Sequence, residues 1–321
     1  MRTTKIAVLP AVLALLGAGL AGCATAAPSG EGSGDAQKLE LILGLNGMSY
    51  YETLACGAKE AAAGTDVVVN VSAANQWAVE AQTTVLNAAL SRGPNTVAIV
   101  PVDPNGLAAP LGQATAQGIK VIAADQSLDP SITSQATIVS DNLQGGQLAG
   151  EAAVEALAGQ GKVLVIAPPP GASGEDARVD GFVDVAEAGG LTLVDTQYAA
   201  DQTAAAAAVS ASLSANPDLA AVYATNEYTL LGAVSALKTA QLNGTVKAIG
   251  VDASQAEVDA LNAGDVYALV AQQPEKIGEL VVEQMIALNA GETVEQTTAV
   301  PMVLLTKDSD DLDEYVYEPS C

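Results

Sequence analysis

The sequence predicts an α/β protein with two doubly wound lobes, each built on its own parallel sheet. Segments with strand character alternate with segments of helical character along the whole body. The strand segments are nearly continuous apolar runs, as expected when helices cover both faces of a parallel sheet. Half of the 321 residues are hydrophobic. About 285 residues follow the N-terminal segment, which is enough for two domains.

The first series of alternating segments begins near Lys38. Val, Ile and Leu dominate its strands, and the first helical segment ends on a glycine, which commonly terminates helices. The predicted elements, in order, are strand 39–45, helix 50–64, strand 66–72, helix 78–93, strand 96–102, helix 105–118 and strand 119–125.

A second series of the same kind fills the rest of the body. Its last helix has a proline at its start, a position that suits proline. The predicted elements are helix 144–159, strand 162–168, helix 175–190, strand 191–198, helix 203–216, strand 220–226, helix 228–240, strand 246–252, helix 254–264, strand 266–272, helix 274–291 and strand 300–306.

The N-terminal segment has the layout of a secretory signal. Arg2 and Lys5 precede an apolar run over 6–21. This run is too short for a comfortable membrane span of about 20 residues. The sequence Leu-Ala-Gly-Cys that ends at Cys23 resembles the lipobox of bacterial lipoproteins, which implies a lipid on the Cys23 sulfur. An ordinary signal peptide with an incidental cysteine is the alternative. Residues 23–37 are then the lipidated cysteine and a flexible tether.

Charge and composition exclude several classes of function. The formal net charge is -25, so phosphate repulsion makes nucleic acid a poor partner. The chain has no histidine, which removes the commonest general base and metal ligand. Neither a P-loop nor a GxGxxG sequence follows the first strand. We therefore expect no enzyme activity, no cofactor and no metal.

Two cysteines remain once Cys23 is assigned to the lipid. Cys56 lies in the first predicted helix and Cys321 ends the sequence. In an oxidising compartment two such thiols favour a disulfide. The alternative is a buried Cys56 with a frayed tail.

Polar side chains stand where many of the predicted strands end. In doubly wound sheets, ligands bind outside the carboxyl ends of the strands. Each of these side chains could instead cap a helix, a role common for Asp and Asn. The strand-end residues are Asn46 and Met48, Asp103, Asp125 and Gln126, Asn226 and Glu227, Asp252, and Gln272.

Several motifs, taken in order, resemble those of periplasmic sugar-binding proteins of the ribose-binding type, the solute receptors of ABC importers. The resemblance covers Lys38 to about Lys307. It implies the type I periplasmic binding protein fold, with ligand between the lobes and three strands crossing between them. The matching motifs are GLNGMSYYETLACGAKEAA, GIKVIAADQS, IVSDNLQGGQLAGEAA, GASGEDARVDGF, NPDLAAVYATNEYTLLGAVSAL, IGVDAS and VAQQP.

The resemblance implies a set of ligand-binding residues. Aromatic faces stack on the apolar face of a sugar ring, and Asp, Asn and Gln side chains bind its hydroxyls. The matching positions are Tyr50, Tyr51, Asp125, Asn226, Asp252 and Gln272. Arg178, in the RxxGF part of its motif, either touches the ligand or holds the neighbouring loop. Trp77, the one tryptophan, either covers the ligand or packs on the lobe surface.

The sequence departs from the ribose-type pattern at several site positions. Gln126 and Asp176 replace two arginines, Met48 replaces an asparagine, and a second-lobe aromatic is missing near Ala200. The pocket therefore leans acidic. This suits a polyol, a differently substituted sugar or a ligand with an amino group, and argues against ribose and against phosphorylated or carboxylated ligands.

The predicted organisation follows from these assignments. A signal peptide (1–22) and tether (23–37) precede an N-terminal lobe (38–140 plus 273–302). The C-terminal lobe and tail comprise 141–272 plus 303–321. We expect a monomer that is exported, held by its lipid at the outer face of the bacterial cytoplasmic membrane, and partnered by an ABC permease and its ATPase.

Three rival functions use the same architecture. A lipid-anchored sensor that presents its closed form to a membrane receptor needs the same cleft and hinge, and the sequence does not separate it from an importer. A hydrolase could use paired aspartates but would lack histidine. The effector domain of a LacI-type repressor is disfavoured by the lipobox and by the missing DNA-binding helices.

Overall fold

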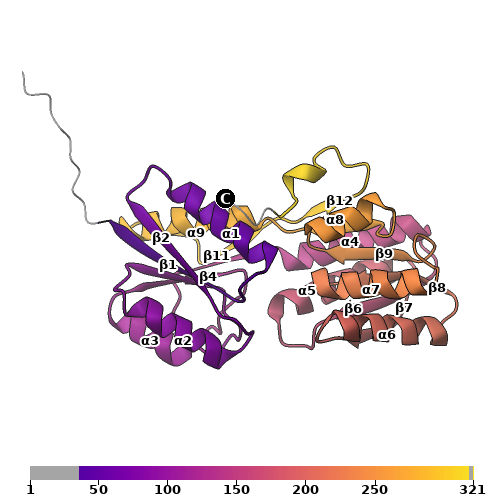
Figure 1. Cartoon of the computed structure of the whole chain (residues 1–321), viewed down its shortest axis with the longest axis horizontal. Helices are drawn as coiled ribbons and strands as arrows, with labels where there is room; N and C mark the ends of the chain where they lie inside the picture. Colours follow the sequence, from indigo (N-terminus) through magenta and orange to yellow (C-terminus); the bar gives the residue numbers. More distant parts are fainter. Residues whose placement is uncertain (1–35, 318–320) are drawn as a thin grey trace, which may run out of the picture. The chain divides into compact units, whose positions relative to one another are not determined.

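The structure is a computed structural model that describes residues 36–317 and 321. Within this part of the chain, the strands form two six-stranded sheets with helices on both faces (Figure 1). The predicted signal peptide, Cys23 and nearly all of the tether lie outside the described residues. Among the described helices, none combines the length and the apolar character that a membrane crossing requires.

The first lobe is built on a wholly parallel sheet. Its elements are β1 (Gln37–Leu43), α1 (Ser49–Ala62), β2 (Val67–Ala73), α2 (Val79–Leu90), β3 (Thr96–Ile99), α3 (Ala108–Ala116), β4 (Lys120–Ala124), β5 (Ala136–Ser140), α9 (Pro274–Asn289) and β11 (Thr297–Val300). The strand order is β11-β5-β4-β3-β1-β2. Leu39 and Leu41 of β1 join the core beneath α1 and α9, and Ile42 joins the core beneath α2 and α3. Both faces of the sheet are therefore covered.

The second lobe repeats this plan with one antiparallel strand at its edge. Its elements are α4 (Asn142–Leu157), β6 (Lys162–Ala167), α5 (Ser173–Ala188), β7 (Thr192–Tyr198), α6 (Gln202–Ala215), β8 (Leu219–Ala224), α7 (Glu227–Thr239), β9 (Lys247–Val251), α8 (Gln255–Asn262), β10 (Ala268–Ala271) and β12 (Val303–Leu305). The strand order is β12-β10-β9-β8-β6-β7, with β12 antiparallel to β10. Val163 and Val165 pack with α4 and α5, whereas Leu164 and Ile166 pack on the α6 and α7 side.

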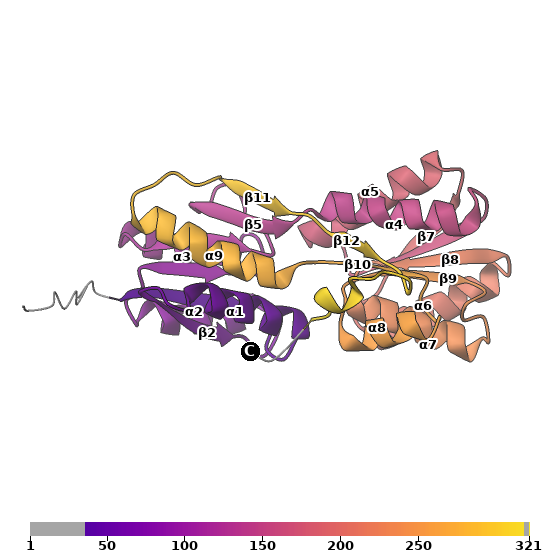
Figure 2. The same ribbon diagram turned by 90° about the horizontal axis from the view of Figure 1, so that it is seen from above.

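The chain passes between the two sheets three times in the described part. In Figure 2, β11 of the first sheet can be followed into β12 of the second. The three connections are residues 140–142, 271–274 and 300–303. The predicted fold class, two parallel-sheet α/β lobes with three crossings, is confirmed.

Two strand predictions differ from the structure. No element is predicted for 126–143, where β5 lies, because β5 is short and two of its five residues are polar. One strand is predicted over 300–306, where the structure has parts of two strands in different sheets. Pro301 separates them, since proline has no N–H for a strand ladder. Side chains hold this connection, with Gln273 donating to the carbonyl of Pro301 and Gln144 accepting from the N–H of Met302.

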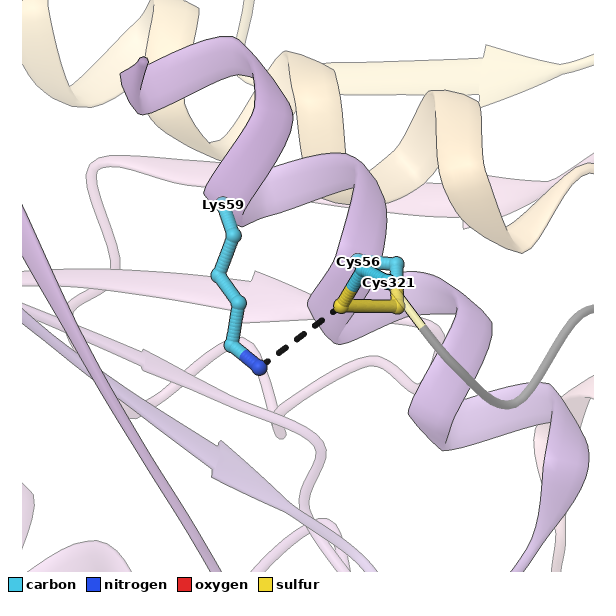
Figure 3. Close-up of a disulfide and its surroundings, with 3 residues drawn as sticks. All are labelled: Cys56, Lys59 and Cys321. Carbon is cyan, nitrogen blue, oxygen red and sulfur yellow. Dashed lines mark hydrogen bonds between the residues drawn. A yellow bond between two sulfur atoms is a disulfide. The ribbon is translucent and has the colours of Figure 1, made fainter.

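The tail after β12 contacts both lobes. It passes through a 3₁₀ helix (Leu312–Glu314), and the N–H of Tyr317 then donates to the carbonyl of Ala253 in the second lobe. Cys321 lies beside Cys56 on α1 of the first lobe, with the two Cα atoms 5.3 Å apart, a separation that suits a disulfide (Figure 3). Lys59 Nζ lies 3.7 Å from Cys321 Sγ. The tail therefore connects the end of the second sheet to a helix of the first lobe.

Helix α1, which carries Tyr50 and Tyr51, crosses helix α9 at close range. A Cβ on Gly57 of α1 would meet the backbone of Glu275, and one on Gly278 of α9 would meet the backbone of Leu54. Glycine permits this approach because it lacks the Cβ. The crossing of α1 and α9 therefore sets where the first turn of α1 lies.

Candidate ligand-binding site

Asp125 is the centre of the first-lobe half of the site. It follows β4 directly and is buried. The hydroxyl of Tyr50 donates to its Oδ1 at 2.7 Å, and the hydroxyl of Tyr51 donates to its Oδ2 at 3.2 Å. Both tyrosines lie in the first turn of α1, so the helix and the strand end together hold the carboxylate.

Asp252 plays the equivalent part in the second lobe. It follows β9 directly and is buried. Its Oδ1 accepts from Gln272 Nε2 at 2.6 Å and from the Tyr317 hydroxyl at 2.9 Å. Its Oδ2 accepts from the backbone N–H of Glu227 at 3.2 Å. The strand ends of β8, β9 and β10 and the tail therefore converge on one carboxylate.

The two aspartates share a position and a backbone conformation. Strands β4 and β9 are each third in the order of their sheets. Asp125 has φ 63° and Asp252 has φ 96°, a region that non-glycine residues rarely adopt. Such strained residues persist where the surroundings over-determine them, and they cluster at ligand sites. The strain is an independent indication that these carboxylates are positioned for a function.

Contacts across the lobes join the two halves. The hydroxyl of Ser140, at the end of β5, donates to Gln272 Oε1 at 2.8 Å. The rings of Tyr50 and Tyr317 meet edge to face with centroids 5.6 Å apart. Gln272 and Tyr317 thus touch the first lobe while donating to the carboxylate of the second, so Asp125 and Asp252 belong to one site.

Arg178 is the one cationic side chain that is buried in the described chain. Its Nε donates to Asn142 Oδ1 and its Nη1 donates to the carbonyl of Thr225, each at 2.7 Å. These partners begin α4 and follow β8. These two contacts fit the predicted role of holding the neighbouring loop, and ligand contact by Arg178 stays a prediction.

Burial dominates the electrostatics of the site. It raises the pKa of Asp125 to about 6, against the opposing effect of the tyrosine hydrogen bonds. Burial and the charge of Asp125 also raise the pKa of Tyr50 and Tyr51 well above the usual value, so both remain hydroxyl donors at neutral pH. The site therefore offers ionisable acceptors held by neutral donors.

Several predicted residues have other partners in the structure. The Asn226 side chain caps α7 by accepting from the N–H of Thr229, and Asp176 accepts from the N–H of Gly171 in the loop before α5. Asp103 likewise accepts from two N–H groups of its own loop. The side-chain oxygens of these three residues thus accept from backbone N–H groups, as the alternative prediction of a capping role requires.

The remaining predicted residues lie at the edge of the site. Asn46 is exposed, Met48 is the half-buried residue before α1, and Gln126 is half-buried beside Asp125. Trp77 is 46% exposed and stacks on Tyr51 with ring centroids 6.4 Å apart. It thus extends the aromatic surface that Tyr51 begins.

Sequence reasoning missed two residues of this site. Tyr317 follows the last strand by twelve residues, and only the tail's path brings it to Asp252. Glu175 precedes Asp176 in the first turn of α5, and its charge raises the pKa of Asp125 and of Tyr51 in addition to the larger effect of burial. The signal for Tyr317 was the aromatic pair in YVYEPSC, close before a cysteine predicted to bond to α1. Among the described residues, no group of acidic or cysteine side chains is arranged to hold a metal ion.

Relatives of this chain are known sugar-binding proteins. It is 29% identical over 227 residues to the ribose import binding protein of Bacillus subtilis (strain 168), spanning 70% of this chain and 73% of that protein. It is 32% identical over 219 residues to the ribose import binding protein of Escherichia coli (strain K12), spanning 67% and 73% respectively.

A solved structure agrees with these matches. An ABC transporter solute binding protein from Agrobacterium vitis, bound with alpha-D-tagatopyranose, superposes with a TM-score of 0.83 at 28% identity, covering 88% of this chain and 99% of that one. The model of the periplasmic binding protein domain matches residues 40–293. The match over most of both lobes confirms the resemblance found in the motifs, and the chain belongs to the periplasmic binding protein family.

Proposed function

We propose that this chain binds a small sugar, polyol or related polyhydroxy compound between its lobes and delivers it to an ABC importer. The observation that carries the proposal is the pair of strained, buried aspartates, Asp125 and Asp252, at equivalent strand ends of the two sheets. The relatives are named as ribose import binding proteins, which supports this proposal. Recognition rather than catalysis fits this chain, which has no histidine.

The chemistry of the site suits hydroxyl groups. Both oxygens of Asp125 and the Oδ2 of Asp252 each accept one described hydrogen bond, so each retains acceptor capacity for a ligand hydroxyl. Buried polar groups left without partners are costly, so a ligand that pairs them gains affinity and specificity. The aromatic surface of Tyr51 and Trp77 supplies a face on which an apolar sugar face stacks.

Ribose is not the ligand that this site favours. Gln126 and Asp176 stand where the ribose-type pattern has arginines, so two donors to sugar oxygens are replaced. Related structures hold other sugars, alpha-D-tagatopyranose in one protein of Agrobacterium vitis and D-fucose in another. We infer that the ligand of this chain is a compound other than ribose, the pentose in the names of those relatives.

Binding is coupled to closure of the lobes 38–140 plus 273–302 and 141–272 plus 303–321. The three crossings are the hinge, and a ligand that touches Asp125 and Asp252 together binds the closed state more tightly than the open one. The free energy available for closure equals this difference in affinity. The permease and its ATPase then accept the closed form.

Two covalent features complete the proposal. The signal peptide is removed, and a lipid on Cys23 holds the monomeric receptor at the outer face of the cytoplasmic membrane, which raises its effective concentration near the permease. In that oxidising compartment Cys56 and Cys321 form the disulfide whose geometry the structure accommodates.

The test measures melting temperature of a soluble form that starts at Ala24, against pentoses, hexoses, polyols and amino sugars. A ligand at a hundredfold excess over its dissociation constant adds about 2.7 kcal/mol to the free energy of unfolding. We expect a clear shift with one class of compound and loss of most of that shift in Asp252→Asn. Asp184→Asn, an equal change at an exposed position of α5, is the matched control.

Two results would contradict the proposal. One is a ligand shift that Asp252→Asn leaves intact. The other is no shift with any compound while mass spectrometry of the denatured protein finds no retained small molecule.

A further inference from the structure

Glu175 carries an acceptor atom that nothing in the described chain satisfies. The residue lies in the first turn of α5 and is partly buried, but its Oε2 is fully buried and has no hydrogen-bond partner among the described residues. Burial raises the pKa of Glu175, although the Arg178 charge opposes this effect. A buried carboxylate oxygen in this condition is costly, so it points to a group that the site has yet to receive.

The charges around Glu175 are mostly negative. It interacts electrostatically with Asp125 of the first lobe and with Asp252 and Asp176 of the second. Each of these interactions raises a carboxyl pKa, as expected between like charges. Three carboxyl groups, on Asp125, Glu175 and Asp252, thus share the walls of one site.

The single buried cation, Arg178, acts on Glu175 through its charge but forms no described hydrogen bond with it. The Nε and Nη1 of Arg178 donate to the amide oxygen of Asn142 and to the backbone carbonyl of Thr225, both of them uncharged acceptors. No described hydrogen bond joins Arg178 to a carboxylate. The carboxyl groups of Asp125, Glu175 and Asp252 therefore outnumber the one guanidinium in the site.

We infer that the ligand carries a protonated amino group that pairs with Glu175, which makes it an amino sugar or an amino polyol. This inference rests on the proposed binding of a polyhydroxy compound between the lobes. The ligand's hydroxyls bind Asp125 and Asp252, and its ammonium group donates to the unpartnered Oε2.

An ammonium group fits this position better than a hydroxyl or a metal ion. A hydroxyl would satisfy one acceptor but would leave the excess charge, whereas an ammonium group supplies a donor and a positive charge together. Metal binding is disfavoured because no group of acidic side chains among the described residues is arranged as a metal site. The same excess charge repels carboxylated and phosphorylated ligands.

The experiment compares matched pairs by calorimetry at neutral pH. The amines are D-glucosamine, D-galactosamine and an aminocyclitol, and their neutral partners are D-glucose, D-galactose and myo-inositol. In the unsubstituted protein we expect at least one amine to bind about tenfold or more tightly than its neutral partner.

Variants assign the preference to Glu175. Glu175→Gln keeps the shape and removes the charge, so it should weaken amine binding by about tenfold to a hundredfold and leave the neutral partner within about twofold. Glu175→Asp should retain the preference. Asp184→Asn, the same loss of charge at an exposed position of the same helix, should change the amine-to-neutral ratio little.

The outcomes separate the two proposals. If a neutral compound binds and its amine does not bind more tightly, or if Glu175→Gln weakens both equally, the inference fails and the polyhydroxy-binding proposal stands. If none of the six compounds nor any other in the melting panel binds to a site shown to be empty, both fail. The comparison in the unsubstituted protein decides the matter even if a variant does not fold.

Discussion

Asp125 and Asp252 show how single residues prepare the site before any ligand arrives. Each adopts a left-handed backbone conformation that costs roughly 1–3 kcal/mol for a non-glycine residue. Each carboxylate is then fixed by a tyrosine hydroxyl, from Tyr50 for Asp125 and from Tyr317 for Asp252. The orientation of the acceptors is therefore settled during folding, which lowers the ordering that binding requires.

The raised pKa of Asp125 predicts two pH trends of opposite sign. Tyr50, Tyr51, Glu175 and Arg178 face this group, and burial raises its pKa from 3.8 to about 6. Ligand hydroxyls favour the ionised form, so affinity for the ligand found in the melting panel should fall about tenfold between pH 7 and pH 5. Without ligand, the contribution of Asp125 to the free energy of unfolding is complete below pH 3.8, its ordinary pKa, and is lost as pH rises through about 6.

Calorimetric titration and denaturant unfolding over this range measure the two trends. In Asp125→Asn both should lose their inflection near pH 6. An affinity that stays constant or improves toward pH 5 would contradict the assignment of Asp125 as an acceptor for the ligand.

The part of the site that sequence could predict is the part that strand ends determine. Asp125, Asp252 and Gln272 follow strands of two predicted sheets, and the rule that ligands bind at carboxyl ends placed them together. Glu175 and Tyr317 could not be predicted as site residues. The position of Glu175 depends on where a helix starts, and that of Tyr317 on the path of the tail, and no sequence periodicity encodes either. Asn226 and Asp176 are predicted to bind ligand, but their side-chain oxygens accept from backbone N–H groups near helix starts. Sequence does not separate the two roles, because capping uses the same residue types as binding.

At the scale of elements, α1 and α9 show how packing places functional groups. Gly57 and Gly278 let the two helices approach until their backbones are nearly in contact. Tyr50 and Tyr51 stand at the start of α1, so any displacement of that helix moves the two donors away from Asp125. A glycine far from the ligand therefore contributes to the geometry of the site.

Gly278→Ala should expose this dependence. Its Cβ would collide with the backbone of Leu54, so overpacking should lower the free energy of unfolding by about 1–3 kcal/mol and weaken ligand affinity as well. Gly112→Ala in α3 is the control, because its Cβ would meet nothing and alanine is the better helix former. Denaturant unfolding and titration of both variants measure the effects. Equal stability of the two variants would refute the close-packing argument.

Element types were largely predictable because long apolar strands and glycine-terminated helices alternate so regularly. The exceptions are informative. β5 is short and two of its five residues are polar, so its strand character comes from its neighbours β4 and β11 rather than from its own sequence. The residues on either side of Pro301 form two strands, β11 and β12, because each side pairs with a different sheet. The local sequence pattern does not say which sheet a segment will join.

At the scale of the molecule, the tail reaches both lobes, and the proposed disulfide would add a covalent link to the three crossings. Tyr317 binds the second lobe through Asp252 and Ala253, and Cys321 lies beside Cys56 on α1 of the first. The two cysteines are 265 residues apart in sequence, so the proposed bond would close a very large loop. In the chain-entropy description, a large loop gives a large restriction of the unfolded state.

Cys321→Ser should therefore lower the free energy of unfolding by about 2–4 kcal/mol. It should also weaken ligand binding, because Tyr317 loses the anchor that holds its hydroxyl at Asp252. Denaturant unfolding with and without reductant measures the first effect, and the variant itself should be insensitive to reductant. Two free thiols in the unreduced protein that starts at Ala24 would rule out the bond.

Trp77 gives the molecule a built-in optical reporter. It is the single tryptophan of the chain, about half of the residue's surface is open to solvent, and it stacks on Tyr51, one of the two tyrosines that hold Asp125. Closure of the lobes over a ligand would change the polarity around this one indole, so its emission would report occupancy without any added dye. A fluorescence titration could then follow the filling of the site in the unmodified protein, with no background from a second tryptophan.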